Sequence, residues 1–249
     1  MSKVSVVIIA KNEEKQISDC LKSVQWADEI VILDDYSTDK TVEIAREYTN
    51  AIQQRKMDVE GTHRNYAYSL TKNEWVLSLD CDERVTPELA TEIDRVLESN
   101  TDYNAYAIPI KTFIGKRWVR YAGYYPARKT RLFKKSCFRY EDAGVHPRIF
   151  LDGKCGDLEG DILHYAYEDF ADVVNRLTKQ TTLEARKWIQ DGRKVSFLKI
   201  LRKFVDRFIK FYFLRKGYKD GLIGFMFSFF HSLYQLLSYA QYWEMKHGR

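Results

Sequence analysis

The chain has 249 residues, of which 45% are hydrophobic and 30% charged, and its formal net charge is +5. This balance is typical of a folded protein and excludes a disordered one, and the length suits one large domain or a domain with an appendage. The four cysteines include no Cys-x-x-Cys pair, so neither a zinc ribbon nor a disulfide framework is indicated. The apolar run that starts at Val4 is too short for a signal peptide, and we expect a cytoplasmic protein.

Short apolar runs alternate with amphipathic segments through the first hundred residues. Strands and helices in this rhythm predict a mainly parallel sheet with helices on both faces. Thr86-Pro87-Glu88 is a strong helix start, because it combines a capping hydroxyl, proline at the first helical position and an acid in the first turn. Strands are expected at residues 4–9, 30–33, 51–54 and 75–79, each followed by a helix, and the last helix is expected to end near residue 99.

Acidic side chains follow two of these strands. Asp34 comes directly after residues 30–33, and Asp80-Cys81-Asp82 follows residues 75–79. Parallel sheets bind ligands at the carboxyl ends of their strands, so we expect both acid groups at one edge. Asp80 and Asp82 are one residue apart on an extended turn and can share one divalent cation, with a solvated acidic turn as the alternative. Oxygen ligands favour Mg²⁺ or Mn²⁺, whose shells are usually completed by phosphate oxygens.

Asp34 has the chemistry to recognise a nucleobase. Its carboxylate can accept a hydrogen bond from the imide N–H of uracil, a donor that cytosine lacks. Ser37 and Asp39 are better placed to cap the next helix, which leaves Asp34 free for such a contact. The alternative is that Asp34 and Asp35 merely begin that helix.

Three motifs in order carry a family resemblance. Residues 5–14 (SVVIIAKNEE), 33–41 (LDDYSTDKT) and 75–83 (WVLSLDCDE) resemble family 2 glycosyltransferases and, more narrowly, are similar to the bacterial lipopolysaccharide-core β-glucosyltransferases. The likeness covers about the first 100 residues, and it resumes at residues 131–133, 145–146, 164–165 and 212–221.

The resemblance implies a GT-A fold, which is Rossmann-like with a mainly parallel sheet flanked by helices, together with a UDP-sugar donor and inversion at the anomeric carbon. It implies that Asp34 holds the uracil, that Asp80 lies on the ribose side, and that Asp82 ligates the metal bridging the diphosphate. His164 is implied as a further metal or diphosphate ligand, with a satisfied core histidine as the alternative. Other substrate-binding residues implied are Ala10, Asn12, Glu13, Arg64 near the base or diphosphate, Arg128 and Arg131 at phosphates of donor or acceptor, and His146. Arg128 and Arg131 are alternatively ordinary surface arginines.

Inversion in a single displacement requires a general base on the acceptor side. Residues 140–146 supply candidates in the expected stretch, and we assign the role to Asp142, with Glu141 second. Relatives often have His-Glu in this stretch, whereas this chain has His146-Pro147.

The C-terminal third predicts helices with an affinity for membranes. From Phe197 to Tyr212, apolar residues recur at helical spacing and basic residues fill the other face, which suits the headgroup region of an anionic bilayer. The alternative is a surface helix packed on the catalytic domain. Residues 222–240 carry no charge and approach the ~20 residues that cross a bilayer. A polar stripe favours a monotopic, partly embedded or domain-packed helix over a span; its residues are Ser228, His231, Ser232, Gln235 and Ser238.

We therefore expect a catalytic domain at residues 1–170 and a helical membrane-associating region at 171–249. The expected activity is transfer of a hexose from a UDP-sugar, with Mg²⁺ or Mn²⁺, to a hydroxyl of a lipid-linked or lipopolysaccharide-core saccharide. The enzyme would act as a peripheral protein at the cytoplasmic face of the cell membrane. The alternatives are transfer to a polyprenyl phosphate, which needs no general base, and a non-catalytic nucleotide-sugar-binding module on the membrane. No nucleic-acid partner is expected, since the basic block lies on an aromatic amphipathic helix.

Overall fold

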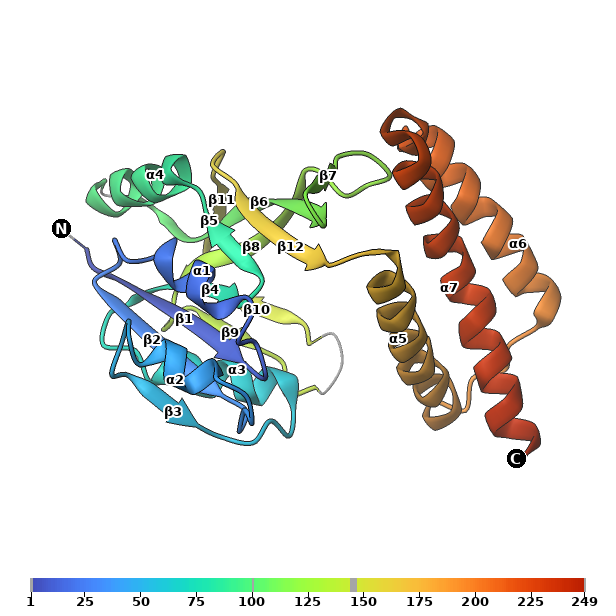
Figure 1. The fold of residues 1–249 in the computed structure, drawn as a ribbon, viewed down its shortest axis with the longest axis horizontal. Helices are drawn as coiled ribbons and strands as arrows, with labels where there is room; N and C mark the ends of the chain where they lie inside the picture. The colour runs from blue at the N-terminus through green and yellow to red at the C-terminus, as the bar shows by residue number, and fades with distance from the viewer. Residues whose placement is uncertain (1, 100, 144–146, 249) are drawn as a thin grey trace. The chain divides into compact units, whose positions relative to one another are not determined.

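A computed structural model describes residues 2–99, 101–143 and 147–248 (Figure 1). The chain forms two compact units, one of residues 1–110 and 128–164 and the other of residues 111–127 and 165–249. The second unit thus joins residues 165–249 with residues 111–127, which lie inside the range 1–170 that we expected to form the catalytic domain. Each unit is described below by itself.

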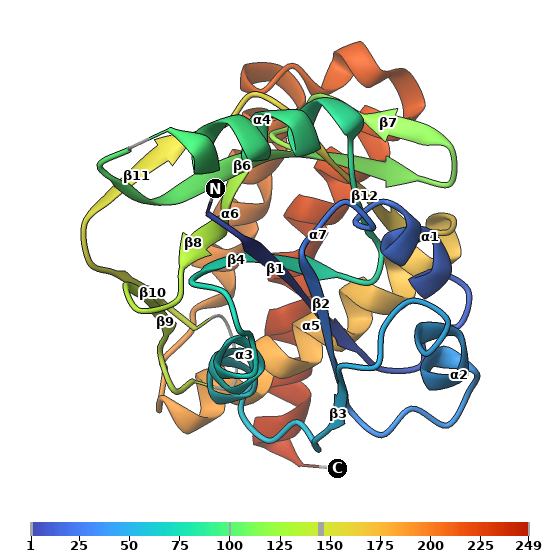
Figure 2. The ribbon, with the colours of Figure 1, turned by 90° about the vertical axis from the view of Figure 1, so that its left-hand side faces the viewer.

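The first unit is built on a parallel sheet with the strand order β3-β2-β1-β4. The central strand β1 is buried on both faces, as is usual for parallel sheets, and its Val6, Val7 and Ile8 are fully buried. Val6 and Ile8 pack with helix α1, whereas Val7 packs with helix α3 on the opposite face (Figure 2). The bounds are β1 Val4–Ala10, α1 Ile17–Lys22, β2 Glu29–Asp34, α2 Thr41–Ala45, β3 Ile52–Gln54, α3 Glu60–Ser69 and β4 Trp75–Asp80.

The second half of the sheet is mixed. Strand β8 joins β4 in the antiparallel sense, and β5 pairs antiparallel with β12 at the other end. The first four strands are parallel, and in the mixed half β11 pairs with β6 in the parallel sense. The further strands are β5 Glu83–Val85, β6 Tyr103–Ile114, β7 Arg117–Val119, β8 Ala127–Lys134, β11 Lys154–Asp157 and β12 Ile162–Tyr167, with a separate hairpin of β9 Phe138–Tyr140 and β10 Ile149–Leu151.

Helix α4 (Pro87–Glu98) begins as its sequence predicts. The side chain of Thr86 accepts a hydrogen bond from the N–H of Leu89 at 3.3 Å, and Pro87 takes the first helical position. Leu89, Ile93 and Leu97 then recur at helical spacing and are buried in the core of the first unit. The predicted start and end of this helix are both confirmed.

The second unit consists mainly of helices, as the expected C-terminal extension requires. Helix α7 packs against both α5 and α6. Phe227 and Phe230 of α7 form one core with Val173 and Leu177 of α5. The helices are α5 Phe170–Gln190, α6 Phe197–Phe208, the π-helical η1 Ile209–Leu214, the short 3₁₀ segment η2 Gly217–Asp220, and α7 Gly221–His247.

The polar stripe of α7 faces the interior of this unit. Ser228, Ser232 and Ser238 are fully buried, and each hydroxyl donates to a backbone carbonyl one turn earlier, at 2.6, 2.8 and 2.7 Å. Within the described residues, one helical stretch, Gly217–His247, is long and apolar enough to cross a membrane. The inward orientation of the stripe matches a helix packed within its own unit.

Candidate active site

The carboxyl ends of the parallel strands bring the two predicted acid groups to one edge. Ala10, near the end of β1, pairs with Asp34 of β2, and its neighbour Ile9 pairs with Asp80 of β4. Because adjacent strands lie about 4.8 Å apart, the backbones of the two aspartates are about 10 Å apart, one on each side of β1. The expectation that both acids share this edge is confirmed.

The carboxylate of Asp34 is engaged by its neighbours, contrary to our expectation that it is left free. The side chain is fully buried. Its Oδ2 accepts hydrogen bonds from the N–H of Ser37 at 3.0 Å and from the Gln54 amide at 2.9 Å, while its Oδ1 accepts from the Ser37 hydroxyl at 2.5 Å. A buried carboxylate requires such donors, and the loop after β2 provides them.

The loops after β1 and β2 are tied together by side chains of the first motif. Asn12, which has a positive φ of 54°, accepts a hydrogen bond from the N–H of Thr38 at 2.8 Å. The N–H of Glu13 donates to the hydroxyl of Thr41 at 2.7 Å. In this structure Asn12 and the backbone of Glu13 thus shape the edge of the sheet beside Ala10.

Asp80 is the shared partner of two arginines. Arg64 of α3 contacts its Oδ1 at 3.2 Å, and Arg131 of β8 contacts its Oδ2 at 2.9 Å. Burial alone would raise the pKa of Asp80, but the charges of Arg131 and Arg64 lower it well below the ordinary aspartate value. Asp80 is therefore a permanent anion that positions both guanidinium groups.

Glu83 belongs to the same cluster, and we did not single it out from the sequence. Its side chain is fully buried, receives Arg131 at 2.5 Å and accepts the N–H of Asp80 at 3.0 Å. Burial raises the pKa of Glu83, and the negative charge of Asp80 raises it further, against the lowering effect of Arg131. The one available signal was its place as the third acid in the run Asp80-Cys81-Asp82-Glu83.

Asp82 has a different partner, His164 of β12. The Nε2 of His164 lies 3.3 Å from Oδ2 of Asp82, because His164 pairs with Glu83 across the antiparallel strands β5 and β12. Asp80, which we expected could share a cation with Asp82, is bound by two arginines in this structure. Among the residues that the structure describes, no group of three or more His, Cys, Asp and Glu side chains could hold a metal. Asp82 and His164 remain as a pair of possible ligands.

The base candidates are anchored to helix α3. Asn65 binds both backbone groups of Tyr140, accepting from its N–H at 2.8 Å and donating to its carbonyl at 2.9 Å. The hydroxyl of Thr62 donates to Asp142 at 2.9 Å, and the N–H of Glu141 donates to the carbonyl of Arg148 at 2.8 Å. Helix α3 therefore contributes Arg64, and its Thr62 and Asn65 hold the segment that contains Glu141 and Asp142.

Two other predicted substrate-binding residues, Arg128 and His146, are not among the contacts described above. The guanidinium of Arg128 donates to Glu159 at 2.9 Å and to the carbonyl of Leu158. His146 lies outside the described residues.

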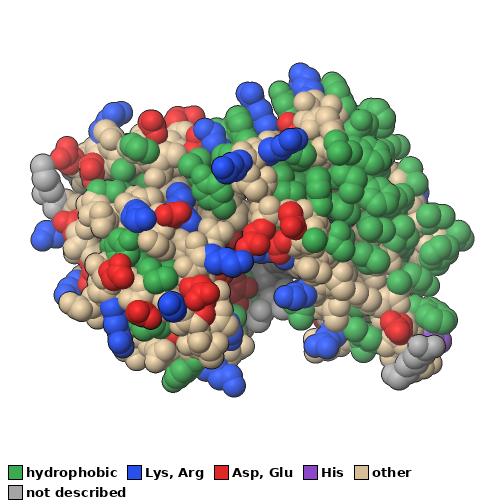
Figure 3. Space-filling model, viewed as in Figure 1, with side chains coloured by type: hydrophobic (Ala, Val, Ile, Leu, Met, Phe, Trp, Pro, Cys, Tyr) green, Lys and Arg blue, Asp and Glu red, His purple; other side chains and the backbone are tan. Residues whose placement is uncertain are grey.

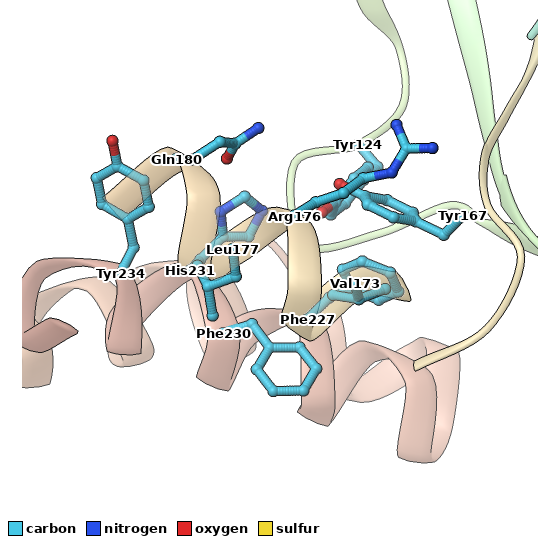
Figure 4. A pocket seen from close by; sticks show the side chains of 10 residues that line it. All are labelled: Tyr124, Tyr167, Val173, Arg176, Leu177, Gln180, Phe227, Phe230, His231 and Tyr234. Carbon is cyan, nitrogen blue, oxygen red and sulfur yellow. The ribbon is translucent and has the colours of Figure 1, made fainter. Parts of the chain in front are cut away.

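A separate small cavity lies within the second unit (Figure 4). Its volume of about 70 Å³ is enough for several water molecules. Burial and the nearby charges of Arg207 and Arg215 lower the pKa of its His231 to about 4. The lining residues are Tyr124, Tyr167, Val173, Arg176, Leu177, Gln180, Phe227, Phe230, His231 and Tyr234.

Comparisons with known proteins identify a family for this chain. Residues 5–150 match the family model described as Glycosyl transferase family 2. An uncharacterized glycosyltransferase of Rickettsia typhi is 27% identical and aligns with 98% of this chain and 88% of its own length. The lipopolysaccharide core biosynthesis glycosyltransferase LpsC of Rhizobium meliloti is 24% identical, with 97% and 92% covered. The crystal structure of S. aureus TarS 1–349 is 17% identical, with 96% and 88% covered and a TM-score of 0.48.

The contact between α3 and the base segment predicts a strict requirement for glycine at position 61. A Cβ at Gly61 would lie 1.8 Å from the carbonyl oxygen of Glu141, so one of the two backbones must shift. We expect Gly61→Ala to lower the free energy of unfolding by about 1–3 kcal/mol in urea denaturation. Ser69→Ala, at an exposed position of the same helix, is the matched control and should stay within about 0.5 kcal/mol. Equal stabilities of the two variants would contradict the contact.

Proposed function

Because the chain belongs to glycosyl transferase family 2, we propose that it transfers a hexose from a UDP-sugar to a saccharide hydroxyl with inversion at the anomeric carbon. The observation that carries the proposal is the strand register in which Asp34 and Asp80 flank the carboxyl end of β1. A nucleotide lying across this edge spans from one aspartate to the other. Asp82 lies two residues after Asp80 and next to His164, and we assign the diphosphate to this position.

The uridine end of the donor is assigned to Asp34. Its Oδ2 already accepts a hydrogen bond from the amide of Gln54, so an N–H donor fits this position. The imide N–H of uracil would take over the role of that amide. Arg64, held by Asp80 at 3.2 Å, is then available beside the ribose and diphosphate.

Asp82 and His164 suit a divalent cation. A carboxylate oxygen and an imidazole nitrogen 3.3 Å apart are donors that Mn²⁺ accepts, and Mg²⁺ binds with even fewer protein ligands. Two protein ligands leave the remaining positions to diphosphate oxygens and water. When bound, such an ion neutralises the charge that develops on the departing nucleoside diphosphate. Asp82 and His164 would hold it at that point.

Asp142 is assigned as the general base, with Glu141 second. Asp142 is solvent-exposed, so an acceptor can reach its carboxylate, and Thr62 restrains it at 2.9 Å. As the acceptor oxygen bonds to the anomeric carbon, the carboxylate takes the hydroxyl proton, and the bond to the diphosphate breaks with its electron pair. UDP leaves from the face opposite the incoming oxygen, which accounts for inversion.

The acceptor is proposed to be a lipid-linked or lipopolysaccharide-core saccharide. The relationship to LpsC, a lipopolysaccharide core glycosyltransferase, over nearly the whole chain supports this class. Such an acceptor is held by the membrane at its cytoplasmic face, so the enzyme has to work at that surface.

The second unit carries a surface suited to this location. Leu198, Leu214 and Leu222 are 74%, 74% and 70% exposed, although fully burying a leucine is worth about 1.5–3 kcal/mol. Figure 3 shows a broad apolar area over α6 and α7. We use the term apolar face for the exposed apolar residues of α6, η1 and the start of α7, namely Leu198, Leu201, Val205, Ile209, Phe213, Leu214, Leu222 and Phe225.

Basic residues from the same helices accompany the apolar face. Each Lys or Arg near an anionic membrane surface contributes about 1 kcal/mol of attraction. We propose that the second unit lies on the bilayer with the apolar face in the headgroup region, as a monotopic helical unit. The exposed basic residues of this stretch are Lys199, Arg202, Lys203, Lys210, Arg215, Lys216 and Lys219.

The metal assignment predicts that Asp82→Ala and His164→Ala each lower transfer from a UDP-sugar by about 100-fold or more, because each removes one of two protein ligands. UDP release in the presence of Mn²⁺ or Mg²⁺ and extracted membrane lipid measures this. Asp157→Asn, at an exposed strand position, is the control. Full activity of Asp82→Ala, or of the wild type in EDTA, would rule out the metal role.

The assignment of Asp142 as the general base predicts that its loss matters for a hydroxyl acceptor but not for a phosphate acceptor. With a saccharide hydroxyl, Asp142→Ala should lower kcat by about 100-fold or more, and Glu141→Ala by less, since the lost group accepts the proton. With a polyprenyl phosphate the nucleophile is already an anion, and neither variant should matter. The rates of both variants are to be measured on both acceptors. Full activity of the variants with the polyprenyl phosphate, and none of any form with the saccharide, would favour the alternative function.

The apolar face predicts binding to anionic vesicles. Replacing Leu198, Leu214 and Leu222 together by serine should lower sedimentation with phosphatidylglycerol vesicles by at least about tenfold, because it removes the three apolar side chains of the face with the highest exposed fractions. Leu183→Ser, a 48% exposed leucine of α5, should bind like the wild type. Retained binding by the triple variant, or equal binding to uncharged phosphatidylcholine vesicles, would contradict the proposal.

A further inference from the structure

Lys129, which we did not single out from the sequence, lies at the sheet edge that carries Asp34 and Asp80. Strands β4 and β8 pair with the register Trp75 to Lys134 and Leu77 to Leu132. Continued to the end of β4, this register sets Lys129 opposite Asp80. Side chains alternate along a strand, so Lys129 lies on the face of β8 that carries Arg131.

The order of residues across the edge gives Lys129 a definite place along a bound nucleotide. Asp34 on β2, Ala10 on β1, Asp80 on β4 and Lys129 on β8 belong to successive strands. At about 4.8 Å per strand, Lys129 is about 14 Å from Asp34. If the uracil lies at Asp34, Lys129 is at the far end of the nucleotide, where the terminal phosphate of UDP lies.

Unlike the neighbouring arginines, Lys129 has no carboxylate as an ion-pair partner among the described residues. Arg64 and Arg131 both bind Asp80, and Arg128 binds Glu159. Lys129 makes no ion pair in the part of the chain that the structure describes, and its residue is solvent-exposed.

The surroundings of Lys129 are those of an anion site. Partial desolvation and the charge of Arg131 lower the pKa of Lys129, while Glu83 and Asp80 act in the opposite direction. An approaching phosphate would relieve this crowding of positive charges. Because Arg64 and Arg131 are held by the carboxylates of Asp80 and Glu83, Lys129 is the cation that can adjust to a ligand.

We infer that Lys129 binds the terminal phosphate of the nucleotide and neutralises it as UDP departs. The inference rests on the proposed function and deepens it. As the bond between the anomeric carbon and the phosphate oxygen breaks, the electron pair stays on that oxygen. The ammonium of Lys129 donates a hydrogen bond to the same phosphate, and no proton has to be transferred.

Binding of UDP and UMP to the Lys129→Met variant tests this assignment. Methionine keeps much of the aliphatic stem and removes the charge. In calorimetry with Mn²⁺, UDP affinity should fall about tenfold or more, whereas UMP, which lacks the terminal phosphate, should change by less than about twofold. Lys129→Arg should recover part of the UDP affinity because it restores the charge.

Lys134→Met is the matched control on the same strand, because Lys134 binds Asn104 at 2.9 Å and lies at the other end of β8. It should leave both affinities unchanged. Unchanged UDP affinity in Lys129→Met overturns the inference, and so does an equal loss for UDP and UMP, which indicates a structural role. If the wild type binds neither nucleotide, the proposed function itself fails, and the role of Lys129 fails with it.

Discussion

The pairing of β1 with β2 on one side and β4 on the other is the constraint on which the site depends. Ala10 and Ile9 occupy the central strand, and their partners across the ladder are Asp34 and Asp80. Parallel pairing makes all three strands end on the same side, so two acids far apart in sequence become neighbours without touching. The fully buried aliphatic side chains of β1 hold this register, because a slip of one residue would move them to the opposite face.

The negative charges of the acidic motif at this edge are largely balanced by arginines. Asp80 and Glu83 are compensated by Arg131, and Asp80 also by Arg64, so part of the acid cluster serves to orient cations. A buried carboxylate without such partners would be protonated or would destabilise the fold. The two acids of Asp-x-Asp therefore have separate roles: Asp80 positions arginines, and Asp82 stays beside His164. In the proposed function, this division would let anionic phosphates approach an edge rich in carboxylates.

Local signals predicted the parts of the fold that depend on local structure. The apolar runs before Asp34 and Asp80 and the capping residues at Thr86 were sufficient to predict strands and a helix start, because these features need only neighbouring residues. The contact between Arg131 and Asp80 joins residues 51 positions apart through β8, which adds to the sheet in the antiparallel sense. No periodicity in the looser middle of the sequence indicates that pairing. The same holds for Glu83, for the engaged carboxylate of Asp34 and for the inclusion of residues 111–127 in the helical unit.

The helical unit combines buried serines on α7 with exposed apolar side chains on α6 and η1, and its packing explains the buried serines. Gly224, Ser228 and Ser232 recur every four residues on α7 and are buried, so they form one small-residue stripe on its inner face. Small residues allow close helix contacts, and a Cβ at Gly224 would come within 1.8 Å of the Gly217 carbonyl. Because the serine hydroxyls bond within their own helix, burying them leaves no donor unpaired. The large apolar side chains of α6 and η1 are then left outside, where water does not stabilise them. This exposed apolar surface, with the adjoining lysines and arginines, is the basis on which we propose an anionic membrane as its cover.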